Sequence, residues 1–264
     1  MIFSFSKYQG TGNDFILIDN RENIFPKNQH IIQQLCNRKF GIGADGLMLL
    51  ENAEHYLFKM VYYNADGNEG SMCGNGGRCI VAFAERLGVI ANQGTFIAVD
   101  GEHDFELENN LVKLKMIDVH EIKNVGKHDF ELNTGSPHYV VFTNDVDNLD
   151  VFGEGRKIRY NETYQKQGIN VNFAEITKDK IQMRTYERGV EDETLSCGTG
   201  NVAVALALAS IQPQYTNKIT LESPGGKLSV YFKQQEHSFS DIWLEGPAEF
   251  VYKGEIEIKE VARD

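Results

Sequence analysis

The chain has 264 residues, of which 41% are hydrophobic, so it can form one large domain or two domains of about 130 residues. Its 38 acidic and 26 basic residues give a formal net charge of -12, and the basic residues are scattered along the sequence. Nucleic-acid-binding proteins usually carry a concentrated basic patch, so a nucleic-acid partner is not expected. The first residues contain no basic region followed by an apolar stretch, and no run approaches about 18 apolar residues, which predicts a cytoplasmic protein without membrane contact.

Cysteine is sparse, and the chain contains only Cys36, Cys73, Cys79 and Cys197. So few cysteines in a chain of this length, with no export signal, argue against a disulfide scaffold. The sequence has no Cys-x-x-Cys pair and no Cys/His quartet, so no metal is expected. We interpret Cys36 and Cys79 as buried packing residues, because each lies inside an amphipathic or apolar helical pattern.

Short strands separated by turns dominate the chain. Alternating or apolar patterns predict strands at 56–64, 138–143, 180–187, 227–232 and 254–261. Helical periodicity is rarer, and it predicts an amphipathic helix near 28–39 and two strongly apolar helices after Cys73 and Cys197. The last of these, at 202–211, is apolar on every face, so we expect it to be buried all round.

The sequence also contains an internal repeat. "GTGNDFILID" at 10–19 resembles "NTGSPHYVVF" at 133–142, a shift of 123 residues, and Asn64 matches Glu187 at the same shift. Cys73 then matches Cys197 at a shift of 124, so the second half has one extra residue in the preceding loop. Two related halves are the simplest explanation.

The repeat predicts an α+β fold of two pseudo-symmetric domains, each a curled mixed or antiparallel sheet around a central helix. We expect the last strand signal, at 255–261, to return and complete the first half. The first domain would therefore comprise residues 1–119 and 252–264 and carry Cys73. The second would comprise residues 120–251 and carry Cys197, with the active site in the cleft between the domains.

Both Cys73 and Cys197 precede a Gly-x-Gly turn at the expected start of an apolar helix. A helix N-terminus presents unpaired N–H groups and the positive end of the helix dipole, and glycine lets an anionic group approach the backbone. Each turn is therefore a candidate carboxylate site, and the same field lowers a cysteine pKa from its usual value of about 8.5. Neither turn continues into the Gly-Lys-Ser/Thr of a phosphate-binding P-loop.

Two matched thiols suggest a reaction that inverts a stereocentre. If the sulfurs of Cys73 and Cys197 face each other across a cleft, one can remove a proton from one face of a carbon. The other can then return a proton to the opposite face. Backbone N–H groups of both helices would stabilise the charge that develops on the substrate's carboxylate. This chemistry needs no cofactor.

The motifs "KYQGTGNDFILID", "YYNADGNEGSMCGNGGRC", "GSPH", "INV", "YERG" and "CGTG" occur in this order over most of the chain. Together they resemble the diaminopimelate epimerase family. The resemblance implies an isomerase that needs no pyridoxal phosphate and interconverts LL- and meso-2,6-diaminopimelate, for lysine and peptidoglycan precursor biosynthesis. It also implies two domains with a central helix in each, a small-molecule substrate and commonly a homodimer.

The resemblance further implies roles for individual residues. Cys73 and Cys197 would be the paired acid and base, which exchange roles with the direction of reaction. His138 and Glu187 would help to set the protonation of the thiols, and Arg188 suits a distal carboxylate because its fork binds bidentately. Other implied substrate contacts come from the side chains of Asn13, Asn64, Asn170 and Glu187, and from the backbone of Gly74, Asn75, Gly198 and Thr199.

This chain departs from the family pattern in three places. Gly46 stands where some members have glutamine, and Ser136 stands where others have asparagine. The segment from Arg188 to Cys197 is one residue longer than the commoner spacing. These differences concern recognition of the distal end of the substrate and leave the thiol pair unchanged.

Two other types of enzyme and a non-catalytic binding module are alternatives to a diaminopimelate epimerase. A proline or hydroxyproline racemase also uses facing cysteines, but it typically has histidine after Cys-Gly, where this chain has Asn75. An isomerase of the phenazine-pathway type lacks the thiol pair. A non-catalytic module could bind a small anion at the helix N-termini, with Cys73 and Cys197 as caps and Asn13, Asn64 and Asn170 stabilising turns.

Overall fold

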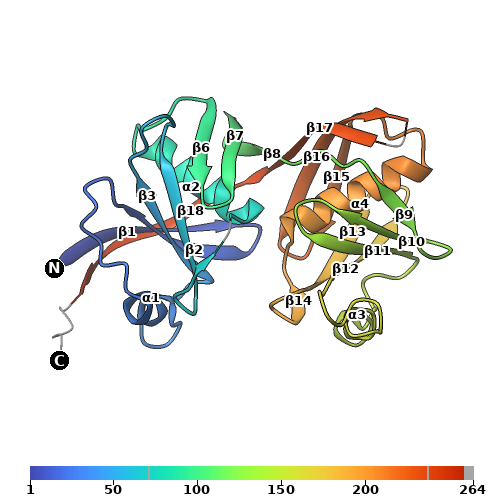
Figure 1. Cartoon of the computed structure of the whole chain (residues 1–264), viewed down its shortest axis with the longest axis horizontal. Helices are drawn as coiled ribbons and strands as arrows, with labels where there is room; N and C mark the ends of the chain where they lie inside the picture. The colour runs from blue at the N-terminus through green and yellow to red at the C-terminus, as the bar shows by residue number, and fades with distance from the viewer. Residues whose placement is uncertain (71, 237, 259–264) are drawn as a thin grey trace. The chain divides into compact units, whose positions relative to one another are not determined.

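The computed structural model describes residues 1–70, 72–236 and 238–258. It divides into two compact units, Met1–Leu114 with Pro247–Asp264, and Lys115–Gly246. In each unit a curved sheet surrounds one central helix, as the α+β expectation requires (Figure 1).

The unit boundaries fall at 114 and 247, whereas the sequence suggested 119 and 252. Residues after 114 already contact the second unit, because Met116 donates its backbone N–H to the carbonyl of Ile242 at 2.8 Å. Residues after 247 already pair with the first unit, because Glu249 lies opposite Gln9 in an antiparallel ladder. Backbone pairing therefore decides which unit these short segments join.

The first unit holds a mixed sheet in which two neighbouring pairs, β2–β3 and β4–β6, are parallel and the rest are antiparallel. In pairing order its strands are β18 (Glu249–Glu257), β1 (Ile2–Gly10), β2 (Asn13–Asp19), β3 (Gly46–Glu51), β4 (Lys59–Asn64), β6 (Gln93–Ala98), β7 (Gly101–Glu108) and β8 (Leu111–Lys115). The short β5 (Glu69–Gly70) pairs with β4, and the helices are α1 (Gln29–Cys36) and α2 (Gly74–Arg86).

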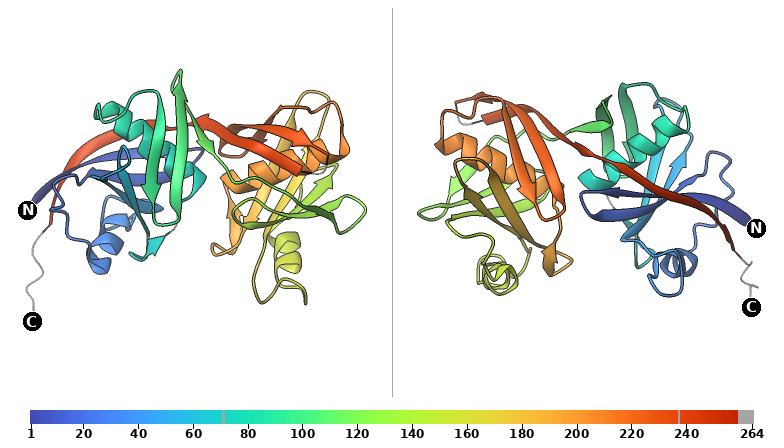
Figure 2. Two further views of the ribbon diagram at one scale, coloured as in Figure 1. Left: turned by 45° about the horizontal axis from the view of Figure 1, so that its top comes forward. Right: turned by 180° about the vertical axis from the view of Figure 1, so that it is seen from behind.

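The chain's last described strand returns to the first unit, as expected from the sequence. Figure 2 shows β18 running beside β1, with which it forms an antiparallel ladder that includes the pair Phe5 and Gly254. Residues 259–261 of the expected strand lie outside the described part of the chain.

The two helices of the first unit cover opposite faces of its sheet. Along β2, Phe15 and Leu17 pack in one buried cluster with Ile80 of α2. The intervening residue Ile16 packs in a second cluster with Ile32 of α1. Successive side chains of a strand point to opposite faces, so β2 is buried on both sides. This explains why its sequence is a continuous run of apolar residues.

The second unit repeats this arrangement strand for strand. Its parallel pairs are β11–β12 and β13–β15, and its other pairs are antiparallel. In pairing order its strands are β9 (Ile122–Asn124), β10 (Asp129–Asn133), β11 (Pro137–Thr143), β12 (Asn170–Ile176), β13 (Ile181–Glu187), β15 (Lys218–Ser223), β16 (Gly226–Gln235) and β17 (Ser238–Pro247). The short β14 (Asp192–Thr194) pairs with β13, and the helices are α3 (Val151–Arg159) and α4 (Gly198–Ile211).

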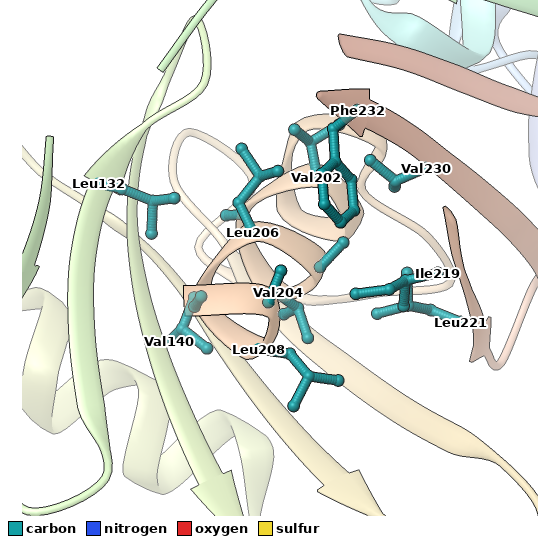
Figure 3. Packing of buried hydrophobic residues seen from close by; sticks show 14 of the residues in the cluster. Leu132, Val140, Val202, Val204, Leu206, Leu208, Ile219, Leu221, Val230 and Phe232 are labelled. Atoms are coloured by element: carbon teal, nitrogen blue, oxygen red, sulfur yellow. The ribbon is translucent and has the colours of Figure 1, made fainter. Parts of the chain in front are cut away.

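Helix α4 is buried on every side, as its apolar sequence predicts. Figure 3 shows Val204 and Leu206 of this helix among labelled side chains from the surrounding strands. The C-terminal end emerges, where Ile211 is 44% exposed, and Thr199 in the first turn is partly exposed. The helix is too short to span a bilayer, and no helix among the described residues is long and apolar enough to cross a membrane.

We expect Leu206→Ala to lower the free energy of unfolding by about 2–5 kcal/mol, because it removes buried methyl groups and leaves a cavity. Urea denaturation followed by circular dichroism measures the loss. Leu195→Ala in the same unit is the matched control, since Leu195 is 53% exposed and its truncation should change stability by less than about 0.5 kcal/mol. Equal losses in the two variants would contradict the central position of α4.

Helix α3 was not expected from the sequence. Gly153 and Gly155 interrupt its helical pattern and reduce helix propensity. The structure gives each a local reason. The carboxylate of Asp150 caps the helix by accepting the N–H of Gly153 at 2.9 Å, and a Cβ on Gly153 would clash with that carboxylate. A Cβ on Gly155 would lie 2.4 Å from the Cβ of Tyr186, so only glycine allows this helix to approach the sheet.

Candidate active site at the N-termini of two central helices

Cys73 is the N-cap residue of α2. Its backbone is extended, with φ -109° and ψ 149°, and its Sγ accepts the N–H of Gly76 at 3.2 Å. A Cβ on Gly76 would lie 2.3 Å from the Cε of Met48 and 3.2 Å from the cysteine sulfur. Glycine at this position therefore lets a backbone N–H reach the sulfur, where it stabilises negative charge.

Cys197 is likewise the N-cap residue of α4, with φ -119° and ψ 114°, but unlike Cys73 its side chain makes no capping hydrogen bond to the helix. Its Sγ lies 3.6 Å from the Oγ1 of Thr199, two residues along the chain. A Cβ on Gly200 would lie 2.4 Å from the Oδ1 of Asn172, so this glycine too is required by a close approach to the sheet. The expectation that each thiol sits at the start of a central helix is confirmed.

His138 lies behind Thr199 in a fully buried position. Its Nε2 is 2.9 Å from the Oγ1 of Thr199, and its Nδ1 is 3.1 Å from the Nδ2 of Asn172. The same Nδ2 also donates to the carbonyl of Tyr139 at 3.1 Å, which orients the Asn172 amide with its N–H groups toward the histidine.

This orientation determines the tautomer of His138. Because Nδ1 accepts a hydrogen bond from Asn172, the ring proton is on Nε2, which donates to the hydroxyl of Thr199. The proton of that hydroxyl then remains available to the sulfur of Cys197. Burial, with a smaller contribution from the positive charge of Arg188, lowers the pKa of His138 to about 3, so the imidazole is neutral at physiological pH.

Arg188 and Asn170 form a second polar cluster with Ser136 in the same unit. The Oγ of Ser136 accepts the Nδ2 of Asn170 at 2.9 Å and the Nη2 of Arg188 at 3.3 Å. The Oδ1 of Asn170 in turn accepts the backbone N–H of Arg188 at 2.9 Å. The neighbouring Glu187 accepts the hydroxyl of Thr194 at 2.9 Å.

In the first unit, Asn13 donates to Asp45 at 2.6 Å, and Asp45 is also paired with Arg38 at 2.7 Å. Asn64 is exposed at the end of β4, opposite Gly46 in the β3–β4 ladder. A Cβ on Gly46 would lie 2.5 Å from the ring of Tyr62. The tyrosine therefore occupies the space that a longer side chain would need.

The structure thus brings the expected residues together in two groups, each within its own unit. The first group contains Cys73, Gly74 and Asn75, and the second contains Cys197, Gly198, Thr199 and His138 beside Arg188 and Asn170. Asn172 and Arg78, which are fully buried polar residues in these groups, were not expected from the sequence. Their only sequence signal is a polar side chain within an otherwise apolar strand or helix. Among the described residues, no group of three or more His, Cys, Asp or Glu is arranged to hold a metal ion.

The family model for diaminopimelate epimerase matches residues 5–119 and 130–251. The chain is 55% identical over 250 residues to the diaminopimelate epimerase of Flavobacterium psychrophilum, covering 94% of this chain and 97% of that one. It is 42% identical over 256 residues to the enzyme of the same name from Chlorobaculum tepidum, covering 94% and 98%.

Solved structures share the fold at low identity. A phenazine biosynthesis protein of the PhzF family from Bacillus anthracis has a TM-score of 0.75 at 15% identity, covering 98% of this chain and 100% of that one. A hydroxyproline epimerase from Agrobacterium vitis has a TM-score of 0.65 at 12% identity, covering 97% and 92%. These likenesses establish a common architecture, which hosts different reactions.

Proposed function

The chain belongs to the diaminopimelate epimerase family, and we propose that it interconverts LL- and meso-2,6-diaminopimelate without a cofactor. The proposal rests on one structural feature above all. Cys73 and Cys197 cap the central helices of two units with matching strand order, and each helix begins with a glycine-rich turn. The product would serve lysine and peptidoglycan precursor synthesis.

In the proposed reaction, the thiolate of one cysteine takes the α-proton from one face of the substrate. The electron pair left on the α-carbon delocalises into the α-carboxylate, whose growing charge is stabilised by backbone N–H groups of Gly74, Asn75, Gly198 and Thr199. The thiol of the other cysteine then delivers its proton to the opposite face. The two sulfurs have exchanged protonation states, so the reverse reaction uses the opposite pair of roles.

We assign His138 to the protonation control of Cys197. The neutral ring donates to Thr199, whose hydroxyl proton can then stabilise Cys197 once this sulfur becomes a thiolate. Asn172 has a positioning role, because its amide holds the ring in the tautomer that donates. Glu187, whose carboxylate is oriented by Thr194, is assigned to the same task and to the substrate's distal ammonium.

Arg188 and Ser136 are assigned to the distal carboxylate. The Ser136 oxygen already accepts two hydrogen bonds, so its own proton is directed outward to an acceptor. Asn170 uses both ends of its amide within the protein, which makes it a positioning residue for this pair. Asn13 and Asn64 remain proposed contacts from the first unit.

We further propose that the protein is a cytoplasmic homodimer. A reducing compartment keeps the two thiols in the state that the reaction needs. Val251 and Tyr252 of β18 are 53% and 42% exposed, which is an apolar surface that a second copy can cover.

Deuterium incorporation tests the function directly. With LL-diaminopimelate in deuterated water, we expect meso product that carries deuterium at the inverted α-carbon, because the returning proton comes from a thiol that exchanges with solvent. Mass spectrometry and NMR of the product measure it. Proline and hydroxyproline should stay unlabelled, and labelling of these instead would favour the racemase alternative. Binding of diaminopimelate without exchange would leave only an anion-binding module.

A further inference from the structure

Arg78 is a fully buried arginine in the first turns of α2, with 0% of its surface exposed. Its guanidinium donates to the carbonyl oxygens of Gly74 at 3.1 Å and Pro247 at 3.3 Å. It also donates to the Oγ1 of Thr11 at 3.3 Å and the Oδ1 of Asn75 at 3.0 Å. All four acceptors are neutral.

A buried cation normally lies against a carboxylate, because burial of an unpaired charge is costly. None of the ion pairs among the described residues includes Arg78. Burial lowers its pKa only to about 10, so the guanidinium is charged at physiological pH. The core of the first unit therefore contains a positive charge whose partner is not a carboxylate.

Among the described residues, the titratable groups that bear on the pKa of Arg78 besides burial are two cysteines, Cys79 and then Cys73. Burial raises the pKa of Cys79 far above its usual value, so this residue is a neutral thiol. Tyr8, which packs against α2 from β1, is also neutral, since burial raises its pKa to about 12. Of the two cysteines, Cys73 is therefore the candidate for the anion, and geometry supports it: Arg78 donates to the backbone carbonyl of Gly74 and to the side chain of Asn75, the two residues that follow Cys73 in the chain.

In the part of the chain that the structure describes, α4 has no buried arginine at the position that corresponds to Arg78. In the repeat, Arg78 matches Val202, which is fully buried among apolar side chains. The hydroxyl of Thr199 lies 3.6 Å from the sulfur of Cys197, and the neutral ring of His138 lies behind that hydroxyl. The nearby cation there is Arg188, which is exposed, and water screens its field far more than the field of a buried guanidinium.

We propose that Arg78 is the internal counter-ion of a Cys73 thiolate, and that it makes Cys73 rather than Cys197 the deprotonated sulfur of the resting enzyme. The inference rests on the proposed function, because it assigns starting protonation states to the acid–base pair. Arg78 is a positioning residue in this scheme, since it acts on substrate only through the sulfur. Proton abstraction by Cys73 would then start the reaction from the resting state.

Alkylation rates test this assignment without any substrate. The fully reduced protein is treated with iodoacetamide from pH 5 to pH 10, and mass spectrometry of peptides measures the rate at each cysteine. Because the thiolate is the reactive form, the midpoint of each rate profile reports its formation. We expect the Cys73 midpoint to lie below that of Cys197, and Arg78→Met to raise it by about one to three pH units.

Two further variants separate charge from structure. Arg78→Lys keeps the charge and should keep a low Cys73 midpoint. Arg86→Met removes an exposed cation from the same helix and should leave both midpoints unchanged. The proposal is wrong if wild-type Cys197 has the lower midpoint, a comparison that needs no variant to fold. It is also wrong if Arg78→Met leaves the Cys73 midpoint in place. If the alkylation midpoints are as expected but the protein does not epimerise diaminopimelate, the proposed function is wrong and the role of Arg78 still holds.

Discussion

Replacing Cys73 or Cys197 by serine should abolish epimerisation, with kcat lower by about 10⁴-fold or more. Serine keeps the size of the side chain and is a preferred N-cap residue, so α2 and α4 should remain folded. Its hydroxyl cannot ionise near neutral pH and therefore cannot take or hold the α-proton. Circular dichroism of diaminopimelate during turnover measures epimerisation, and thermal unfolding confirms the fold.

The double variant, in which both Cys73 and Cys197 are replaced by serine, tests whether the two cysteines act together. If both sulfurs act on the same α-carbon in one reaction, the double variant should be no slower than either single variant. Cys36→Ala is the matched control, because burial raises the pKa of Cys36 to about 12 and keeps it an unreactive thiol. Near-normal turnover of Cys73→Ser or Cys197→Ser would remove that cysteine from the mechanism.

The helix N-termini could be predicted from the sequence because their signals are local. A cysteine, a Gly-x-Gly turn and an apolar run of helical length are adjacent in the chain, and the repeat presents them twice. The central position of α4 follows from the same apolar run, since a helix without a polar face must be buried. Local pattern and burial agree here, and the structure confirms both.

The polar partners of the site could not be predicted because they depend on strand register. Asn172 reaches His138 only because β11 and β12 run parallel with His138 opposite Asn170. Gly46 has no side chain because β3 pairs with β4, and the ring of Tyr62 on β4 occupies the space that a side chain at position 46 would need. Local sequence patterns do not show which segments far apart in the chain pair with one another.

The two helix N-termini are alike in backbone and different in charge. Both present a capping cysteine and glycine N–H groups, which suits a reaction that must run in both directions. A single buried arginine distinguishes them, with Val202 as its apolar counterpart. An enzyme that uses two cysteines in this way needs one thiolate and one thiol at rest, because two thiolates or two thiols would both be inactive, and a buried cation near one sulfur favours this singly protonated pair.

Recognition of the distal carboxylate depends on Arg188 in the proposed site. Its Nη1 donates to the carbonyl of Gln167 at 3.2 Å and its Nη2 to Ser136, which orients the guanidinium and leaves further N–H donors. Gly168 makes room for this arrangement, because a Cβ there would lie 2.7 Å from the Cδ of Arg188. An oriented guanidinium can bind a carboxylate bidentately, which a lysine cannot.

Arg188→Met should therefore lower kcat/KM for diaminopimelate by about 100-fold, which corresponds to roughly 3 kcal/mol of charge-assisted hydrogen bonding. Most of the loss should appear in KM, because the distal carboxylate is bound equally in the ground and transition states. Lysine, which lacks that carboxylate, should show no further loss as an alternative substrate in α-proton exchange. Arg156→Met removes an exposed arginine of α3 and is the control for net charge. If Arg188→Met weakens exchange of both substrates equally, the distal carboxylate lies elsewhere.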